Sequence, residues 1–597
     1  MKRLLILSLC ASMLLSCFLT GCNNTADPAE STGEATATEK ATTQETEPAG
    51  TTSEETESET EPVIDNGPMP EAGQERSLSN VAVVAGDSAT EVYAAAELTK
   101  YLELAGVTMK DDGYPIKISV DPEMGEESYR IKIFRKSTNG TTIVGGNRGV
   151  IYGVYRLLEE MGFRFFTPEL EVIPEGRVAL TTGVIEYEPV FEMRQSSWVP
   201  SASDIDWCVK NGLNQGTWLD IPEEKGDEWS YYLWCHSFAE IPGTPWESQP
   251  CLTDPAILET AKAYVRNVLE TRPKAQIISI SQNDNYNYCK CENCAAVDAE
   301  EGSPSGTLLR FVNAIAADIA EDYPDVIVDT LAYQYTQTAP KITKPLPNVC
   351  VRLCSLHCCS IHGFDDPNCR ENQNFAKDLL DWEKICDRLY IWDYTNCFAY
   401  AIPTYENLFS IREKMRFYAD HNVKGMFTQG NSDSVSGEFG DLRAYLLAKL
   451  MQNPYMTDRE YDTHMNEFLK AYYGEGWMHI RAYIELVCRD QDSGCRAFYF
   501  DPFMVHDATW YQSMEDTFDL LWDKAEEKAG DRLAYVQRSR LQWRYIKLMY
   551  APNEEEAKKF VEEVTAAGIY WREGVKSLPE GVSMSSPIHL WMDNPFT

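Results

Sequence analysis

The chain has 597 residues, 44% of them apolar and 11% aromatic, and its formal net charge at pH 7 is −40. This length predicts two to four domains rather than one core. The negative charge argues against nucleic acid as a partner, because phosphate binding needs clustered Lys and Arg. Abundant aromatics are usual for carbohydrate-binding clefts, although large aromatic cores would account for them equally well.

The first 22 residues have the pattern of an export signal. Lys2 and Arg3 precede an apolar run, residues 4–18, that is too short for a stable membrane span. Leu19-Thr20-Gly21-Cys22 then resembles the bacterial lipobox, in which cleavage before the cysteine leaves it lipidated. We expect lipidation at Cys22 and a protein anchored to the cell membrane, facing outside the cytoplasm at the cell surface or in the periplasm. A plain secretory signal is the alternative.

Residues 23–75 are rich in Thr, Ser, Glu, Ala and Pro and hold almost no large apolar side chains. Such a segment cannot bury enough surface to fold, so we expect a disordered acidic tether. Of the 18 cysteines, Cys10 and Cys17 leave with the signal and Cys22 takes the lipid, which leaves an odd number. At least one of the others must therefore be free, metal-bound or in an intermolecular bond.

Residues 76–189 predict a small α/β domain. Apolar patterning indicates strands at 81–84, 116–120, 129–134, 141–145 and 163–166, and helices at 90–105 and 147–161. The order β-α-β-β-β-α-β favours one sheet with both helices on one face. The stretches 91–98, 143–157 and 162–166 resemble the N-terminal domain that precedes the barrel in α-glucuronidases and β-hexosaminidase-like glycosidases, where it is mostly structural support.

Residues 190–455 alternate between strand and helix patterns. The expected strands are 193–198, 215–219, 232–238, 276–282, 326–335, 349–356, 389–394 and 425–430. Helical runs at 255–270, 305–322, 374–386 and 407–421 separate several of them. Strand alternating with helix is typical of a parallel sheet, and eight repeats favour a closed (β/α)8 TIM-like barrel over a doubly wound sheet.

Residues 456–597 predict a C-terminal α-helical domain packed on the barrel. The helical stretches are 461–473, 477–488, 513–529, 532–549 and 553–567. Barrel and helical region together resemble bacterial lipoproteins that carry the domain of unknown function 4838. The matching stretches are 251–255, 283–285, the cysteines of 289–294, 347–353, 390–394, 437–450 and 472–474. The resemblance implies a glycosidase-like barrel and supplies no substrate. The loop after His236 looks short for that family, which would open or reshape the cleft.

An apolar strand, residues 276–282, runs into carboxylate and amide side chains, which is typical of the catalytic face of a barrel. Glycosidic hydrolysis needs two carboxyl groups, one an acid and the other a base or nucleophile. We expect Asp284 to be the acid and Asp393 or Glu438 its partner. The alternatives are a rim carboxylate that satisfies backbone N–H groups for Asp284, and a helix N-cap for Glu438.

Several other side chains fall at or near the expected strand ends. His236 and Asn283 are candidates to bind sugar hydroxyls, although a lone His is more often structural. Arg352 could pair with a uronate carboxylate, but an ion pair within the barrel fits it better. Five aromatic residues together suit a sugar-binding floor, while each alone fits packing. They are Trp198, Tyr333, Tyr335, Trp392 and Tyr394.

Cys289, Cys291 and Cys294 form a C-x-C-x-x-C cluster whose thiolates could share one metal ion. A fourth ligand could come from across the barrel top. The candidates are Cys354, His357, Cys358 and Cys359. We expect structural zinc here, holding the loop that carries Asp284; a disulfide plus a free thiol is the alternative for an exported chain. Catalysis itself calls for no cofactor, and no Walker loop, dinucleotide fingerprint or Gly-x-Ser-x-Gly elbow is present.

The leading hypothesis is a surface-anchored glycoside hydrolase that cleaves a polysaccharide or oligosaccharide by a two-carboxylate mechanism. It would be α-glucuronidase-like or hexosaminidase-like, with uronic acid or an acetylated amino sugar in its substrate. The rival is a non-catalytic glycan-binding lipoprotein built on the same barrel. Two strand-end carboxyls roughly 5 to 10 Å apart would favour hydrolysis. In both cases we expect a carbohydrate partner and no nucleic acid, and the protein would contact the membrane only through its lipid anchor.

Overall fold

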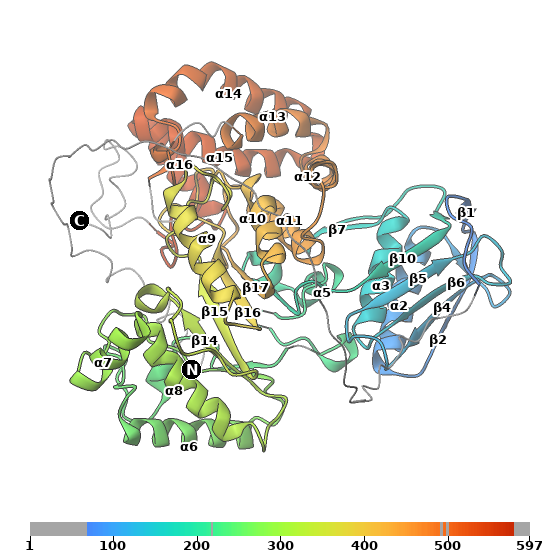
Figure 1. Ribbon diagram of the computed structural model, residues 1–597. Coiled ribbons are helices and arrows are strands. Elements are labelled where there is room, and N and C mark those ends of the chain that lie inside the picture. The colour runs from blue at the N-terminus through green and yellow to red at the C-terminus, as the bar shows by residue number, and fades with distance from the viewer. Residues whose placement is uncertain (1–67, 217–218, 228, 490–493, 497–500, 578–597) are drawn as a thin grey trace, which may run out of the picture.

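The computed structural model describes residues 68–577, apart from 217–218, 228, 490–493 and 497–500. The expected signal, Cys22, most of the expected tether and the end of the chain lie outside the described residues. Figure 1 shows an N-terminal sheet on one side of a central parallel sheet and a group of helices above it. Among the described helices, none is both long enough and apolar enough to cross a membrane.

The N-terminal sheet has six strands in the order β10-β5-β6-β4-β2-β3. Two helices, α2 (Ala89–Leu104) and α3 (Gly149–Glu160), pack against each other and against this sheet, so they share one face as the sequence predicts. Ser88 and Glu91 form a capping box that starts α2. The strands are β2 (Asn80–Ala85), β3 (Thr108–Met109), β4 (Tyr114–Val120), β5 (Tyr129–Ile133), β6 (Thr141–Gly145) and β10 (Gly183–Tyr187).

The strand expected at 163–166 is not part of that sheet. β7 (Arg164–Thr167) instead forms an antiparallel hairpin with β8 (Leu170–Val172). The side chains of β7 explain this position, because Phe165 enters the N-terminal core and Phe166 enters the central core. The hairpin thus joins the two cores, and β10 takes the edge place in the sheet. A further short pair, β1 (Glu75–Ser77) and β9 (Ala179–Thr181), is also separate.

The central sheet is parallel throughout and curled, with seven strands in the order β11-β17-β16-β15-β14-β13-β12. Of the strand expected at 215–219, the described residues show one bridge, between Gln195 and Gln215, and residues 217–218 lie outside the described part of the chain. In place of the strand expected at 232–238 there is a two-residue strand, Tyr231–Tyr232. A closed ring of eight continuous strands is therefore not present in the described residues. The strands are β11 (Met193–Ser196), β12 (Tyr231–Tyr232), β13 (Ile277–Ser279), β14 (Ile327–Ala332), β15 (Val349–Cys354), β16 (Leu389–Tyr394) and β17 (Val423–Gln429).

Helices cover the outer face of the curled sheet. Alternation along β16 divides the two faces: Leu389 and Ile391 pack toward the helices, and Tyr390 and Trp392 pack toward the inside of the curl. The covering helices are α6 (Pro255–Thr271), α7 (Glu292–Glu301), α8 (Pro304–Ile319), α9 (Arg370–Glu383), α10 (Ser410–Asp420) and α11 (Gly440–Gln452). Two short helices, α4 (Val199–Ser203) and α5 (Ile205–Lys210), follow β11.

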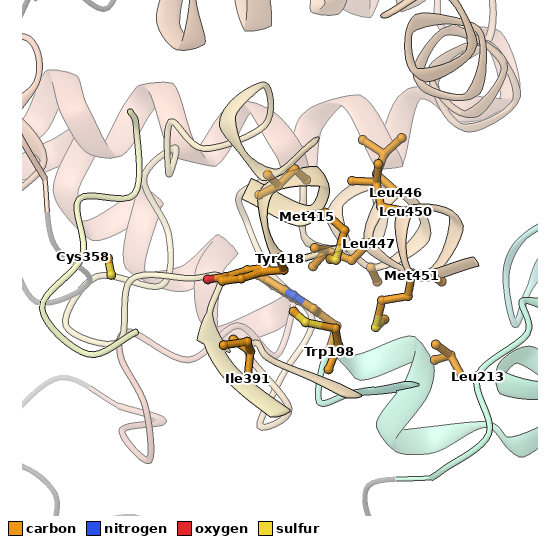
Figure 2. Packing of buried hydrophobic residues seen from close by; sticks show 14 of the residues in the cluster. Trp198, Leu213, Cys358, Ile391, Met415, Tyr418, Leu446, Leu447, Leu450 and Met451 are labelled. Carbon is orange, nitrogen blue, oxygen red and sulfur yellow. The ribbon is translucent and has the colours of Figure 1, made fainter. Parts of the chain in front are cut away.

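The C-terminal helices share one core with the central sheet. Helix α11 is buried on nearly all sides, as expected of a helix enclosed by other elements. Figure 2 shows its Leu446, Leu450 and Met451 packed above Trp198 and Leu213. The helices that follow are α12 (Asp458–Tyr473), α13 (Trp477–Cys488), α14 (Ala508–Lys528), α15 (Leu533–Tyr550) and α16 (Glu554–Ala566), each close to its expected range. This packing holds the segment after α16 against the rim of the sheet.

Candidate active site

A pocket of about 330 Å3 opens at the carboxyl ends of the parallel strands. Its walls come from the segments that follow β11, β12, β16 and β17, and from Glu573 beyond α16. Ligand sites on parallel α/β sheets lie at this end of the strands. A larger cavity of about 1220 Å3 is lined by Gln276 and Val326, which precede β13 and β14, so it lies at the opposite end. We therefore place the candidate active site in the smaller pocket.

Aromatic rings form one side of this pocket. The Trp234 ring lies 4.7 Å from the Trp392 ring and 4.8 Å from the Phe427 ring, measured between centroids. Trp392 also donates its indole N–H to Gln429 Oε1 at 2.7 Å, which fixes the plane of the ring. Flat rings with one face toward a pocket suit the apolar faces of sugars. Trp392, expected from the sequence, lies here, and Trp234 and Phe427 were missed because the strand pattern around them reads as core.

His236 lies in the same pocket with a strained backbone. Its φ is 51°, and that of Leu233, another lining residue, is 54°, both in the left-handed region. Such outliers concentrate at functional sites. The Nδ1 atom lies 2.8 Å from the carbonyl oxygen of Gln282, which only accepts, so Nδ1 carries the proton. Nε2 is then an acceptor; it is buried and has no partner among the described residues, so it can take a hydrogen bond from a sugar hydroxyl.

Three carboxyl groups that line the pocket were not expected from the sequence, those of Glu240, Asp433 and Glu573. Asp433 follows β17, and its Oδ2 accepts a hydrogen bond from the backbone N–H of Gly574 at 2.8 Å. Glu573 is tied to the rim by its own N–H, which donates to the Phe398 carbonyl at 3.0 Å. Loss of water contact, with smaller contributions from the charges of Asp433 and Asp284, raises the pKa of Glu573 to about 8. Glu573 is therefore protonated at neutral pH, as a general acid must be.

Asp284 lies beside the pocket, at the end of the segment that follows β13. Its Oδ1 accepts hydrogen bonds from the Tyr333 hydroxyl at 3.0 Å and from Gln334 Nε2 at 3.1 Å. The Tyr333 ring is 6.1 Å from the ring of His236, so both expected residues belong to the edge of this site. Gln334 has a φ of 52°, a further strained residue at the same place. Two donors aimed at one oxygen fix the orientation of this carboxyl group.

Asn283 is a positioning residue and does not line the pocket. Its Oδ1 accepts from Ala239 N at 2.9 Å, and its Nδ2 donates to the carbonyls of Pro245 and Ser248 at 3.2 and 2.9 Å. With all these bonds inside the protein, its amide is already satisfied. Asn283 thus holds residues 239–248 beside Asp284, and its contact with substrate stays a prediction.

Asp393 and Glu438 are placed away from the pocket. On β16 the side chains of Asp393 and Tyr394 point to opposite faces of the sheet, and Asp393 faces the helices. There it accepts hydrogen bonds from Ser355 Oγ at 2.7 Å and from the Tyr418 hydroxyl at 3.1 Å. Burial raises the pKa of Asp393. Glu438 is buried in an ion pair with Arg443 at 2.6 Å, ahead of α11. Neither carboxylate is among the residues that line the pocket.

The remaining expected binding residues are also held by internal contacts. Arg352 is fully buried, 3.7 Å from Asp329, over the Tyr231 ring at 4.7 Å and over the Trp234 ring at 5.7 Å, and it is not among the residues that line the pocket. Trp198 is buried and donates to Thr395 Oγ1 at 2.9 Å. Tyr335 stacks on Tyr288 at 4.4 Å, and Tyr394 packs beside Trp392 at 6.2 Å. Of the five aromatics, only Trp392 lines the pocket.

The internal position of Asp393 gives a first testable prediction. Asp393→Asn keeps an acceptor for Ser355 and Tyr418, so we expect activity and stability close to those of the wild type. Asp393→Ala removes the acceptor of both hydroxyls, and we expect it to lower the free energy of unfolding by about 1–3 kcal/mol. Denaturant unfolding and activity per folded molecule measure the two effects. A large loss of activity in Asp393→Asn would instead return Asp393 to the reaction.

The expected cysteine cluster is completed by a residue that was not among the candidates. Cys251 Sγ lies 3.7 Å from Cys291 Sγ and 3.8 Å from Cys294 Sγ, and Cys289 completes a set of four whose donor atoms lie within 4.8 Å of one another. Cys251 follows a loop rather than a strand, so position along the chain gave no indication of it. Cys354 and Cys358 are buried elsewhere, and His357 is exposed. The cluster could hold a metal ion at the start of α7.

The curled parallel sheet with an aromatic, acidic pocket at its carboxyl ends defines a protein with a glycosidase-like fold. A solved structure with a similar fold is that of a family GH115 4-O-methyl-α-glucuronidase, BtGH115A, with specificity for decorated arabinogalactans. Its TM-score is 0.55 at 10% sequence identity, over 86% of this chain and 80% of that one. Two further likenesses are weaker. A GH138 enzyme targeting pectin rhamnogalacturonan II has a TM-score of 0.42 at 12% identity (82% and 73% covered), and a family 89 glycoside hydrolase from Clostridium perfringens has 0.46 at 11% (80% and 65%).

The family model described as "Domain of unknown function (DUF4838)" matches residues 165–485, more than half of the chain. The chain therefore belongs to this family, as the motifs in its sequence indicated. The match begins at the β7 hairpin and ends within α13, so it includes the whole parallel sheet. Comparison with curated proteins gives no match.

Proposed function

We propose that this protein is a glycoside hydrolase that acts on a terminal sugar held in the pocket beside His236. The observation that carries the proposal is Glu573, a carboxyl group with a pKa of about 8 in a pocket with aromatic walls, close to the charges of Asp433 and Asp284. An acid that is protonated at neutral pH beside a carboxylate is the chemical requirement for glycosidic cleavage.

In the proposed mechanism Glu573 gives its proton to the leaving oxygen of the glycosidic bond. Asp284, held by Tyr333 and Gln334, supplies the negative charge that stabilises the anomeric carbon, as nucleophile or as the base that activates water. This assignment moves the acid from Asp284 to Glu573 and keeps Asp284 in the reaction. Asp433 raises the pKa of Glu573 and lines the pocket without taking part in bond cleavage.

The charge of the pocket limits the sugar that it can take. The described lining residues include the acids Glu240, Asp433 and Glu573 and no Lys or Arg. A uronate would meet acidic side chains and no cation among these residues, since Arg352 does not line the pocket. We therefore propose a neutral or N-acetylated sugar. The volume is at the lower end for ligand sites, which favours release of single terminal residues.

A non-catalytic glycan-binding protein remains the second candidate. It is favoured by one observation, that Asp284 lies beside the pocket and is not among the residues that line it. If the two carboxyl groups cannot flank one bond, the aromatic wall and His236 would still hold a sugar ring.

The test is sugar release from a panel of polysaccharides and aryl glycosides with neutral, N-acetylated and uronic sugars. Wild type is compared with Glu573→Gln, and Asp393→Asn serves as the matched control. Release from neutral or N-acetylated substrates that is lost in Glu573→Gln and kept in Asp393→Asn supports the proposal. Glycan binding with no release by any variant supports the second candidate.

Two further features belong to the proposed function. We propose that lipid on Cys22 anchors the protein to the cell membrane, and that Cys251, Cys289, Cys291 and Cys294 bind structural zinc. The zinc proposal is supported by sulfur separations of 3.7 and 3.8 Å, since tetrahedral zinc with Zn–S bonds of about 2.3 Å sets edges of roughly 3.8 Å. The same loop carries Tyr288, which stacks on Tyr335, so the ion would stiffen the segment between Asp284 and α7.

A further inference from the structure

A second group of metal-ligating side chains lies away from the pocket and from the first cysteine cluster. It consists of Cys359, His362, Cys369 and Cys495, whose donor atoms all lie within 4.8 Å of one another. Cys359 and His362 are in the loop after β15, Cys369 is the residue before α9, and Cys495 lies between α13 and α14. Three segments, one of them more than 120 residues away in sequence, therefore bring their donors to one point.

The distances between the donor atoms fit four ligands around one metal ion better than they fit a disulfide. Cys369 Sγ lies 3.5 Å from Cys495 Sγ, and His362 Nδ1 lies 3.3 Å from Cys359 Sγ and 3.7 Å from Cys495 Sγ. Tetrahedral zinc with ordinary bond lengths requires S–S edges of roughly 3.8 Å and S–N edges of roughly 3.6 Å. A disulfide would draw two sulfurs to roughly 2.05 Å and leave the imidazole and the third thiol outside the bond.

The surroundings suit a thiolate-rich centre. The backbone N–H of Arg496 points at Cys359 Sγ at 3.4 Å, and Lys414 Nζ donates to the Cys359 carbonyl at 2.5 Å. Asn372 holds the loop through its Oδ1, which accepts from Cys359 N at 2.8 Å, and its Nδ2, which donates to His362 O at 2.8 Å. N–H donors and a cation beside the sulfurs would balance the single negative charge of zinc bound to three thiolates and one neutral imidazole. Cys359 and Cys369 are almost fully buried, which keeps competing water away.

We propose that Cys359, His362, Cys369 and Cys495 bind one Zn2+ as a closed structural Cys3His site. Soft thiolates with one imidazole in tetrahedral arrangement select zinc among the common divalent ions, and four protein ligands leave no open position for chemistry. Binding displaces the protons of the three thiols into solvent and changes no oxidation state. The ion joins the rim loop of the parallel sheet to the segment that leads from α13 to α14.

This join supports the pocket through the residue next to Cys495. Arg496 is fully buried, forms an ion pair with Glu406 and donates to the Thr404 carbonyl at 3.2 Å. Its own carbonyl accepts hydrogen bonds from Ser360 N at 2.8 Å and Ser360 Oγ at 2.9 Å. Residues 404–406 continue the segment after β16 that lines the pocket. The proposed ion therefore fixes Arg496, and Arg496 fixes the base of that wall.

The experiment measures zinc per chain in the full-length protein, purified in the presence of reductant and dialysed against metal-free buffer. Cys369→Ser is expected to hold one zinc ion fewer per chain than the wild type. Cys386→Ser, which removes a buried cysteine outside both clusters, is the matched control and should hold as much zinc as the wild type. Equal zinc content in Cys369→Ser and wild type, or no zinc in the wild type, would overturn the proposal.

A second measurement covers the case in which Cys369→Ser does not fold. The full-length Cys291→Ser variant, in which the first cluster is disabled, is loaded with Co2+ in place of zinc. A tetrahedral cobalt spectrum with thiolate charge-transfer bands, lost when His362→Ala is added, supports a Cys3His centre. Peptide mapping of the unreduced wild type that finds a disulfide joining any two of Cys359, Cys369 and Cys495 would exclude it.

Discussion

Glu573→Gln is expected to lower kcat for the release of sugars from natural glycosides by roughly 100- to 10,000-fold, the range that general acid catalysis contributes. Gln has the shape of Glu but cannot give a proton to the leaving oxygen. Aryl glycosides with acidic phenols need little protonation, so their release should fall much less. The dependence of kcat on the pKa of the leaving group, measured for both proteins, separates the loss of an acid from the loss of a fold.

The pH dependence of the wild type is part of the same expectation. Glu573 is active while protonated, so kcat/KM should fall as the pH rises through about 8, the pKa of the free carboxyl. Asp433→Asn removes a negative charge that raises this pKa, and the fall should move to lower pH with kcat at acidic pH little changed. In Glu573→Gln this fall of kcat/KM with rising pH should be absent. If the same fall persists in Glu573→Gln, a group other than Glu573 supplies the proton.

The stability of Glu573→Gln gives an independent check. An acid whose folded pKa is raised stays neutral when the unfolded chain ionises, so it costs stability as the pH rises from about 4.5, the ordinary value, toward 8. Gln does not ionise, and the variant should therefore be as stable as the wild type at pH 5 and more stable at pH 8. Loss of activity with unchanged or raised Tm is the pattern of a residue kept for function.

The elements of this fold are largely readable from the sequence because their patterns are local. β16 and α13 begin and end at the expected residues, since both are regular apolar patterns with clear ends. The strand expected at 232–238 fails for a physical reason. Leu233 and His236 adopt left-handed backbone conformations, which no strand allows, and side-chain periodicity does not reveal φ.

The site was less predictable than the fold because it depends on contacts between distant segments. Asp284 is easy to single out since it directly follows a buried strand, and its catalytic role stays a prediction. The alternation of one strand does not say which face is inside: Trp392 points into the curl and Asp393 away from it. Glu573 follows five helices, and nothing near it in sequence signals a pocket. The fourth ligand of the first cysteine cluster, Cys251, was missed for the same reason.

Asp284→Asn is the second variant for which we expect a large effect, a loss in kcat of roughly 100- to 1,000-fold or more, because it removes the charge that stabilises the transition state. Asn keeps an oxygen for Tyr333 and Gln334, so the fold should hold and sugar binding should change little. Tyr333→Phe is the graded control, since it removes one of the two donors and leaves the carboxylate in place.

The anomeric configuration of the sugar that the wild type releases then decides how this carboxylate acts. A product that retains the configuration of the substrate requires a covalent intermediate and makes Asp284 the nucleophile. A product of inverted configuration makes Asp284 the base that activates water. Full activity in Asp284→Asn would remove Asp284 from the mechanism, and Asp433, the other carboxylate close to Glu573, would take its place as the partner to be tested.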